Sequence, residues 1–193
     1  MNEQGWTLVE LLVVVAIVMI FGGVFVGHLK AYSVEAHVLG AGRIFKGEFV
    51  KARSIAARAG VQTALRFETG PEGDSISTYQ DGNHNGVRAA DISAGIDRRI
   101  AGPVPLTASA PGVRVGINPG VPAIPPDTGV LDTSDPVRFG PGNMLSFSPL
   151  GTATPGTFYV AGQGLQGAVR VTPGSARVRL MVCRGSGRWL EQR

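Results

Sequence analysis

The sequence predicts an α+β fold, in which one long N-terminal helix precedes a head of antiparallel β-strands. Residues 1–70 contain no proline, and residues 11–21 form an unbroken apolar run, which together favour a long helix. After Gly60, short apolar segments alternate with turns rich in glycine and proline, a pattern typical of strands. The 193 residues, of which 44% are hydrophobic and 17% charged, suit one folded domain with an appendage.

Composition excludes several classes of protein. The 28 glycines and 13 prolines follow no G-X-Y period, which excludes a collagen triple helix. Cys183 is the only cysteine, so an intrachain disulfide and a cysteine-rich zinc module are excluded as well. The net charge of +4 is a mild excess, whose meaning depends on where the charges lie.

The N-terminal segment has the length of a membrane span. As a helix, residues 6–26 extend roughly 31 Å, about the thickness of the hydrocarbon core of a bilayer. Glu10 is the only charged residue in it, and a carboxylate within a span costs a few kcal/mol, which favours a function for it. Alternatively, Glu10 lies in the first turn, near the headgroups and the positive end of the helix dipole.

Two other interpretations of this segment stay open. A plain uncleaved anchor explains its length but not the residues around Glu10. A secretory signal peptide requires a basic n-region, whereas Met1 to Gly5 contain Glu3 and no lysine or arginine.

The run Gly5-Trp6-Thr7-Leu8-Val9-Glu10-Leu11-Leu12 resembles the processing motif of type IV prepilins and type II secretion pseudopilins. The resemblance implies cleavage after Gly5 by a prepilin peptidase and N-methylation of Trp6, which stands where Phe is usual. It also implies that Glu10 pairs with the terminal amine of a neighbouring subunit. A buried carboxylate and ammonium each relieve the other's desolvation, so such a pair sets the register between subunits.

The helix is expected to continue as far as Gly60, which is well placed as a glycine cap. Apolar residues recur at alternating spacings of four and three along its second half, so this half is predicted to be amphipathic. The stripe consists of Val34, Val38, Ala41, Phe45, Phe49, Ala52, Ala56 and Ala59.

Seven short segments after Gly60 are predicted to be strands. They are residues 61–67, 75–79, 113–117, 144–148, 157–161, 168–172 and 177–183. The last two alternate valine or leucine with arginine, which predicts strands that are buried on one face only. Nine of the thirteen prolines lie between Gly102 and Gly142, so residues 102–142 are predicted to be a mostly irregular insertion. This insertion is either a contact surface for a partner or a passive loop without a function of its own.

Two further segments narrow the resemblance to one subfamily of these pilin-like proteins. The first is Asp81-Gly82-Asn83-His84-Asn85-Gly86 followed by Asp91, and the second is Phe147-Ser148-Pro149-Leu150-Gly151 followed by Gly156-Thr157-Phe158. Both are similar in type and order to segments of the H-type (GspH) minor pseudopilins and FimT-like minor pilins.

The first of these segments also matches half of a calcium loop, with Asp81, Asn83, Asn85 and Asp91 as candidate oxygen ligands. The twelfth position is Ile92 rather than Glu, and Asn85-Gly86 is also a good hairpin turn, so the turn is favoured over a calcium site. Gly162-x-Gly164-x-x-Gly167 formally fits a dinucleotide fingerprint, but a strand pattern follows it, which favours a hairpin.

No other cofactor, metal cluster or catalytic motif is predicted, and the protein is not expected to be an enzyme. Cys183, at a strand end, is expected to be a small core residue.

The C-terminal segment is basic. From Ala168 onward, the sequence contains six arginines and a single acidic residue, Glu191. Alternation places Arg177 and Arg179 on one strand face, and Arg184, Arg188 and Trp189 follow, a set that suits phosphate contacts and base stacking. FimT-like pilins that bind DNA carry a Gly-Arg-x-Arg motif near this end, where this chain has Ala176-Arg177-Val178-Arg179. The alternative is a solvated strand face or a contact with neighbouring pilins.

The sequence thus predicts a leader (residues 1–5), a transmembrane half-helix (6–28), an amphipathic half-helix (29–60) and a β-rich head (61–193). The function that the resemblance implies is that of a structural minor pilin or pseudopilin. Such a protein spans the bacterial inner membrane once and assembles with other pilins into a type II secretion pseudopilus or type IV pilus. The alternative function is DNA binding during uptake.

Overall fold

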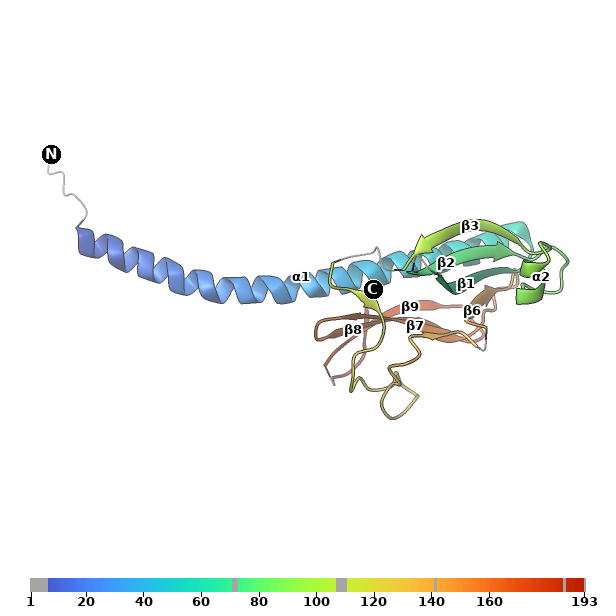
Figure 1. The fold of residues 1–193 in the computed structure, drawn as a ribbon. Helices are drawn as coiled ribbons and strands as arrows, with labels where there is room; N and C mark the ends of the chain where they lie inside the picture. The colour runs from blue at the N-terminus through green and yellow to red at the C-terminus, as the bar shows by residue number, and fades with distance from the viewer. Residues whose placement is uncertain (1–6, 71–72, 107–110, 141, 186, 193) are drawn as a thin grey trace.

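The computed structural model describes residues 7–70, 73–106, 111–140, 142–185 and 187–192 of the chain. The fold is α+β, as predicted, with one helix packed on antiparallel sheets. Helix α1, Leu8–Ala59, is continuous, and in Figure 1 its N-terminal part extends far beyond the head.

Both ends of α1 are capped by residues that the sequence places there. Thr7 is the N-cap, and its hydroxyl accepts a hydrogen bond from the backbone N–H of Glu10, whose carboxylate in turn accepts one from the backbone N–H of Thr7. This capping box satisfies two of the amides that a helix start leaves without partners. At the other end Gly60 adopts a left-handed conformation, with φ of 70°, as predicted for a glycine cap.

The head contains two antiparallel sheets. The first has the strand order β3-β2-β1-β6, and the second the order β10-β9-β8-β7-β4, with β5 also pairing with β7. The strands of the first sheet are β1 (Thr63–Gly70), β2 (Gly73–Gln80), β3 (Arg98–Pro105) and β6 (Met144–Phe147). Those of the second are β4 (Arg114–Val115), β5 (Val137–Arg138), β7 (Gly156–Gly162), β8 (Leu165–Val171), β9 (Val178–Arg184) and β10 (Leu190–Gln192).

The main core lies between α1 and the sheets. Along the predicted stripe, the residues from Val38 to Ala56 are buried and Val34 is partly buried, whereas Ala59 is exposed, so the prediction for this last position was wrong. Phe49 is fully buried and lies edge-on to Phe67, Phe139 and Phe158, with ring centroids 5.7 to 6.4 Å away. These aromatic contacts join the helix to both sheets.

Glycines in the β7–β8 hairpin let α1 approach the second sheet closely. A Cβ on Gly162 would lie 2.5 Å from a methyl group of Val38, and one on Gly167 would lie 3.0 Å from its other methyl group. Gly164 takes a positive φ of 72° in the two-residue turn between β7 and β8. The glycine-rich run is therefore a hairpin, as predicted.

The insertion packs as a second layer on the outer face of the β7-β8-β9 sheet. Ile117, Val121, Ile124 and Leu131 pack there against residues of this sheet, among them Tyr159. Gln166, 1% exposed, anchors this layer, because its side chain donates to the Gly116 carbonyl and accepts from the Asn118 N–H.

This layer corrects one prediction. Strands β8 and β9 were expected to be buried on one face only, yet most of their residues are buried on both faces because the insertion covers the outer one.

All seven predicted strands occur with shifted ends, but the sequence reasoning missed β3, β5, β10 and the short helix α2, Ala89–Ser93. Strands β2 and β3 pair antiparallel, so the predicted turn residues Asn85-Gly86 do lie between paired strands, but within a long connection that includes α2 rather than in a tight turn.

Candidate functional site

The N-terminal half of α1 exposes a continuous series of large apolar side chains. Their exposed fractions range from 42% at Val15 to 78% at Leu8, and Phe21 is 71% exposed. Soluble monomers rarely expose apolar surface in such a continuous run, which usually marks an interaction site. Within the described residues, no helical stretch combines the length and the hydropathy that a membrane crossing requires.

Glu10 lies in the first turn of α1. Its carboxylate accepts hydrogen bonds from the backbone N–H and the hydroxyl of Thr7, each at 3.1 Å. Both partners are exposed, and Glu10 therefore closes the capping box within its own chain. Gly5 and Trp6, the residues predicted to be processed, lie outside the described residues.

Arg179 of β9 and Arg177, which directly precedes this strand, lie on the outer face of the second sheet, as their alternation predicted. Val178 and Leu180 are buried on the opposite face, toward α1. Glu191 of β10 lies across from them. One of its oxygens is 2.9 Å from a guanidinium nitrogen of Arg177, and the other is 3.7 Å from one of Arg179. The sequence pattern could not show that this carboxylate faces both arginines.

The other basic residues of the C-terminal segment lie elsewhere. Arg184 is paired with Glu35 of α1, which raises the pKa of its guanidinium further. Trp189 donates its indole N–H to the Pro122 carbonyl at 2.9 Å and, with Arg188, lines a separate groove on the insertion. The structure thus brings Arg177 and Arg179 together, but not the whole predicted set.

Three of the four candidate calcium ligands, Asp81, Asn83 and Asp91, already accept hydrogen bonds from protein groups. Asp81 is 7% exposed and accepts from the backbone N–H groups of Asn83 and Gly86, while Asp91 accepts from the Asn83 side chain. Asn85 donates its backbone N–H to the Asn83 side chain. These bonds close the loop as a set of Asx turns.

No cluster of three metal-ligating side chains occurs among the residues that the structure describes. Cys183 is buried in the outer cluster of the second sheet, as predicted for a core residue. This burial raises the pKa of its thiol.

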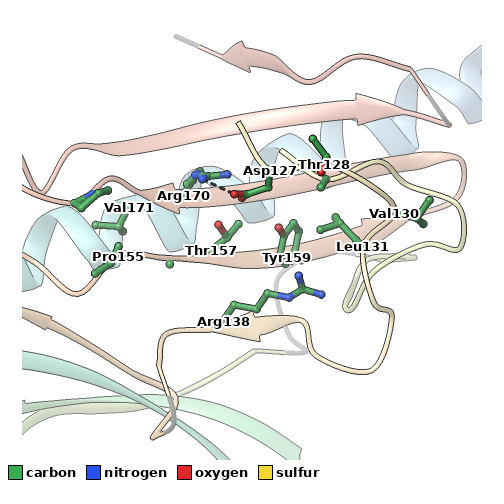
Figure 2. Close-up of a pocket in the computed structure, with 13 residues that line it drawn as sticks. Asp127, Thr128, Val130, Leu131, Arg138, Pro155, Thr157, Tyr159, Arg170 and Val171 are labelled. Carbon is green, nitrogen blue, oxygen red and sulfur yellow. Dashed lines mark hydrogen bonds and ion pairs between the residues drawn. The ribbon is translucent and has the colours of Figure 1, made fainter. Parts of the chain in front are cut away.

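A polar cleft that sequence reasoning missed lies on the outer face of the second sheet. Its volume is about 370 Å³, and Arg138, Thr157, Tyr159 and Arg170 line it together with residues of the insertion (Figure 2). Burial raises the pKa of the Tyr159 phenol, which is 3% exposed. In the structure Val137 and Phe139 are buried and Arg138 is not, but the sequence alternation around Arg138 does not indicate the cleft.

No protein-family model, curated protein or solved structure matches this chain.

Proposed function

We propose that this protein is a structural subunit of a pilin-like filament, a minor pilin or pseudopilin assembled through the N-terminal half of α1. In this proposal a prepilin peptidase removes residues 1–5, and the remaining helix anchors the head in the bacterial inner membrane before assembly. The fold is then of the type IV pilin kind, with residues 61–193 as the head.

The exposed apolar half of α1 carries the proposal. Its large apolar side chains from Leu8 to Phe21 are 42% to 78% exposed, although burying apolar surface is worth about 25 cal/mol per Å². Lipid chains or the same helix of neighbouring subunits would cover them. The resemblance of residues 5–12 to the prepilin motif distinguishes a filament subunit from a plain anchor.

Glu10 provides the test of assembly. In a filament its carboxylate would leave the exposed capping box and pair with the terminal amine of the adjacent subunit. Leaving one partner of a buried ion pair alone costs about 3–5 kcal/mol, so Glu10→Gln is expected to lower incorporation by at least about a hundredfold. The measurement is the amount of protein in sheared filaments relative to membranes, in a host with a prepilin peptidase and an assembly system.

Glu48→Gln is the matched control. Glu48 also lies on α1, but beside the head, where it pairs with Lys51 at 3.7 Å. The proposal is supported if the Glu48→Gln variant is incorporated normally while incorporation of the Glu10→Gln variant is lost. Equal incorporation of the two variants contradicts it.

The second candidate function is DNA binding, which the shared outward orientation of Arg177 and Arg179 favours. The side chain of Arg177 is 66% exposed and remains accessible beside Glu191. Phosphate contacts by these groups would make binding strongly dependent on salt.

Two opposite substitutions test DNA binding. Glu191→Gln removes the carboxylate that both arginines face and is expected to tighten binding, whereas Arg177→Glu with Arg179→Glu is expected to abolish it. Affinities of the full chain for a short duplex at several salt concentrations provide the measurement. Absence of binding at low salt, or indifference to both changes, would eliminate this function.

A further inference from the structure

The head has two ends along α1, and the exposed apolar half of this helix emerges from one of them. Figure 1 shows strand β8 at the end from which this half emerges and helix α2 at the other end. The contacts agree with this view, because Val34 of α1 lies beside Gly162 at the β7–β8 turn, and Glu35 pairs with Arg184 at the end of β9. We refer to this end as the base of the head.

The base carries exposed aromatic and aliphatic side chains. Tyr32 of α1 is 74% exposed and Leu190 of β10 is 57% exposed, and they line two grooves that share the Glu35–Arg184 pair as a common wall. Trp189 is partly buried and lines a third groove with prolines of the insertion. Tyrosine and tryptophan are enriched at the boundary between lipid and water, because their rings combine an apolar body with a polar tip.

The charge of the base is positive. Among the described residues that line these three grooves, Glu35 is the only acidic one, and it is paired with Arg184. Arg188 is exposed and lines both the groove of Leu190 and that of Trp189. None of the ion pairs in the described part of the chain involves Arg188, so its guanidinium is available to donate to a phosphate oxygen.

The course of α1 determines what the base meets. In the proposed membrane anchor the span ends at residue 28, so Tyr32 comes four residues later, about 6 Å further along the helix. One headgroup layer of a bilayer is about 5–8 Å thick. Because α1 is continuous from Leu8 to Ala59, the base can move away from the membrane surface only if the whole helix tilts.

We propose that the base of the head docks on anionic phospholipid headgroups while the protein is anchored in the membrane. Arg188 binds a lipid phosphate, and Tyr32, Trp189 and Leu190 lie at the level of the headgroups. A lipid surface fits both features of the base, because anionic headgroups attract arginine and the interface accommodates aromatic rings. This inference rests on the proposed membrane anchor, but the anchor alone does not require any contact between the head and lipid.

The first step of the test is flotation of the full chain with vesicles. One kind consists of phosphatidylcholine alone, and the other is an equal mixture of phosphatidylcholine and phosphatidylglycerol. We expect flotation with both kinds, because the apolar half of α1 inserts into either. A chain that floats with neither contradicts the membrane anchor itself and overturns the docking with it, whereas failure of the docking alone leaves flotation intact.

The second step is quenching of Trp189 fluorescence by a lipid that carries a nitroxide on its headgroup. The chain has one other tryptophan, Trp6, so a Trp6→Phe background is used. The quenching gives the ratio of docked to free heads. We expect this ratio to be at least about fivefold higher in the mixed vesicles than in phosphatidylcholine, and to lose this difference at high salt. Equal ratios in the two kinds of vesicle, or no effect of salt, would overturn the proposal.

Two substitutions at the base change its charge in opposite directions. Arg188→Glu is expected to lower the ratio of docked to free heads at least about fivefold, because it replaces an attracted charge by a repelled one. Gln163→Lys adds a charge on the exposed β7–β8 turn and is expected to raise the ratio about fivefold, a gain that misfolding cannot imitate. Unaltered docking of the Arg188→Glu variant, or weakened docking of the Gln163→Lys variant, would contradict the assignment.

Arg99→Glu is the matched control. It makes the same change of charge at an exposed position of β3, close to α2 at the opposite end of the head (Figure 1). The ratio of docked to free heads is expected to stay unaltered in this variant. A loss as large as that of Arg188→Glu would mean that only the net charge of the protein matters, and would overturn docking through the base.

The ratio of protein to lipid distinguishes a lipid surface from a second copy of the chain. Docking on lipid predicts that the quenching of Trp189 stays the same as the protein is diluted in the membrane. If a second copy covered the base instead, the quenching would change with dilution and would not depend on phosphatidylglycerol. That result would overturn the proposal.

Discussion

The two halves of α1 belong to one continuous helix but differ in how they bury their apolar side chains. In the half beside the head, Val38 and Phe49 have no exposed surface, whereas in the N-terminal half Leu8 and Phe21 are more than two-thirds exposed. Residues 6–26 are apolar almost throughout, with Glu10 as their only charged residue, whereas the half beside the head is apolar along one stripe, which the sheets cover. One half has its partner within the chain, and the other requires a partner outside it.

This difference separates folding from assembly. The head half contributes its stripe to the core that joins both sheets, so changes in it should alter the stability of the protein. Changes in the N-terminal half should leave the stability of the head unaltered and act only where a membrane or neighbouring subunits cover the helix. Substitutions in the two halves can therefore break or sharpen the comparison.

The largest effect on stability is expected from Phe49→Ala. The side chain is completely buried, and three other phenylalanine rings surround it. Removing it should lower the free energy of unfolding by about 3–5 kcal/mol, from lost burial and the cavity left behind. Denaturant unfolding of the variant provides the measurement, and a loss below about 1 kcal/mol would show that this half does not form the core of the head.

A pair of glycines gives the second test. Gly162→Ala should destabilise the head by about 1–3 kcal/mol, since the new methyl group would meet Val38 and Val34 at 2.5 and 3.1 Å. Gly47→Ala is the control on α1 itself, where nothing lies within 4 Å, and it should stabilise by about 0.8–1.0 kcal/mol through helix propensity. Effects of the same sign in thermal unfolding would disprove the close approach of α1 to the β7–β8 hairpin.

Ile17→Gln tests the opposite half. Ile17 is 47% exposed, so the free energy of unfolding of the head should change by less than about 0.5 kcal/mol. Incorporation into filaments or membranes should fall, because a buried amide without a partner costs about 1–3 kcal/mol. A strongly destabilised head would mean that this half contacts the head and would remove the distinction between the two halves.

The smallest expected effect is on the stability of the head at alkaline pH. Burial raises the pKa of Tyr159 above its unfolded value of about 10, so the neutral phenol is favoured in the folded state. The resulting stability is complete below about pH 10 and is lost as the pH rises through the folded pKa. In the Tyr159→Phe variant, the free energy of unfolding should therefore fall less steeply with pH above about pH 10. An unchanged fall would show that another group causes the loss of stability at alkaline pH.

The elements with strong periodicity were predictable from the sequence. The stripe of α1 and the Gly60 cap follow from local spacing, and the β7–β8 hairpin follows from glycines between two apolar runs. The ends of the strands were less certain, because they depend on pairing with distant segments. Strand β3 was missed since its prolines, Pro103 and Pro105, disfavour a central strand, but it lies at an edge of its sheet.

The sites were harder to predict than the fold. Arg177 and Arg179 were placed correctly on one face, yet the position of Glu191 depends on the pairing of β10 with β9. Arg138, Tyr159 and Arg170 are distant in sequence, and only the register of β5, β7 and β8 brings them together. Nothing local in the chain indicates such a row, because each residue alone fits an ordinary strand.

The most direct test of the filament proposal is the intact mass and N-terminal peptide of the protein, extracted from membranes of a host that contains a prepilin peptidase. The proposal predicts a chain that begins at N-methylated Trp6, with the apolar half of α1 retained. A chain that retains Met1, or one that is cut near the end of the apolar run, would contradict it.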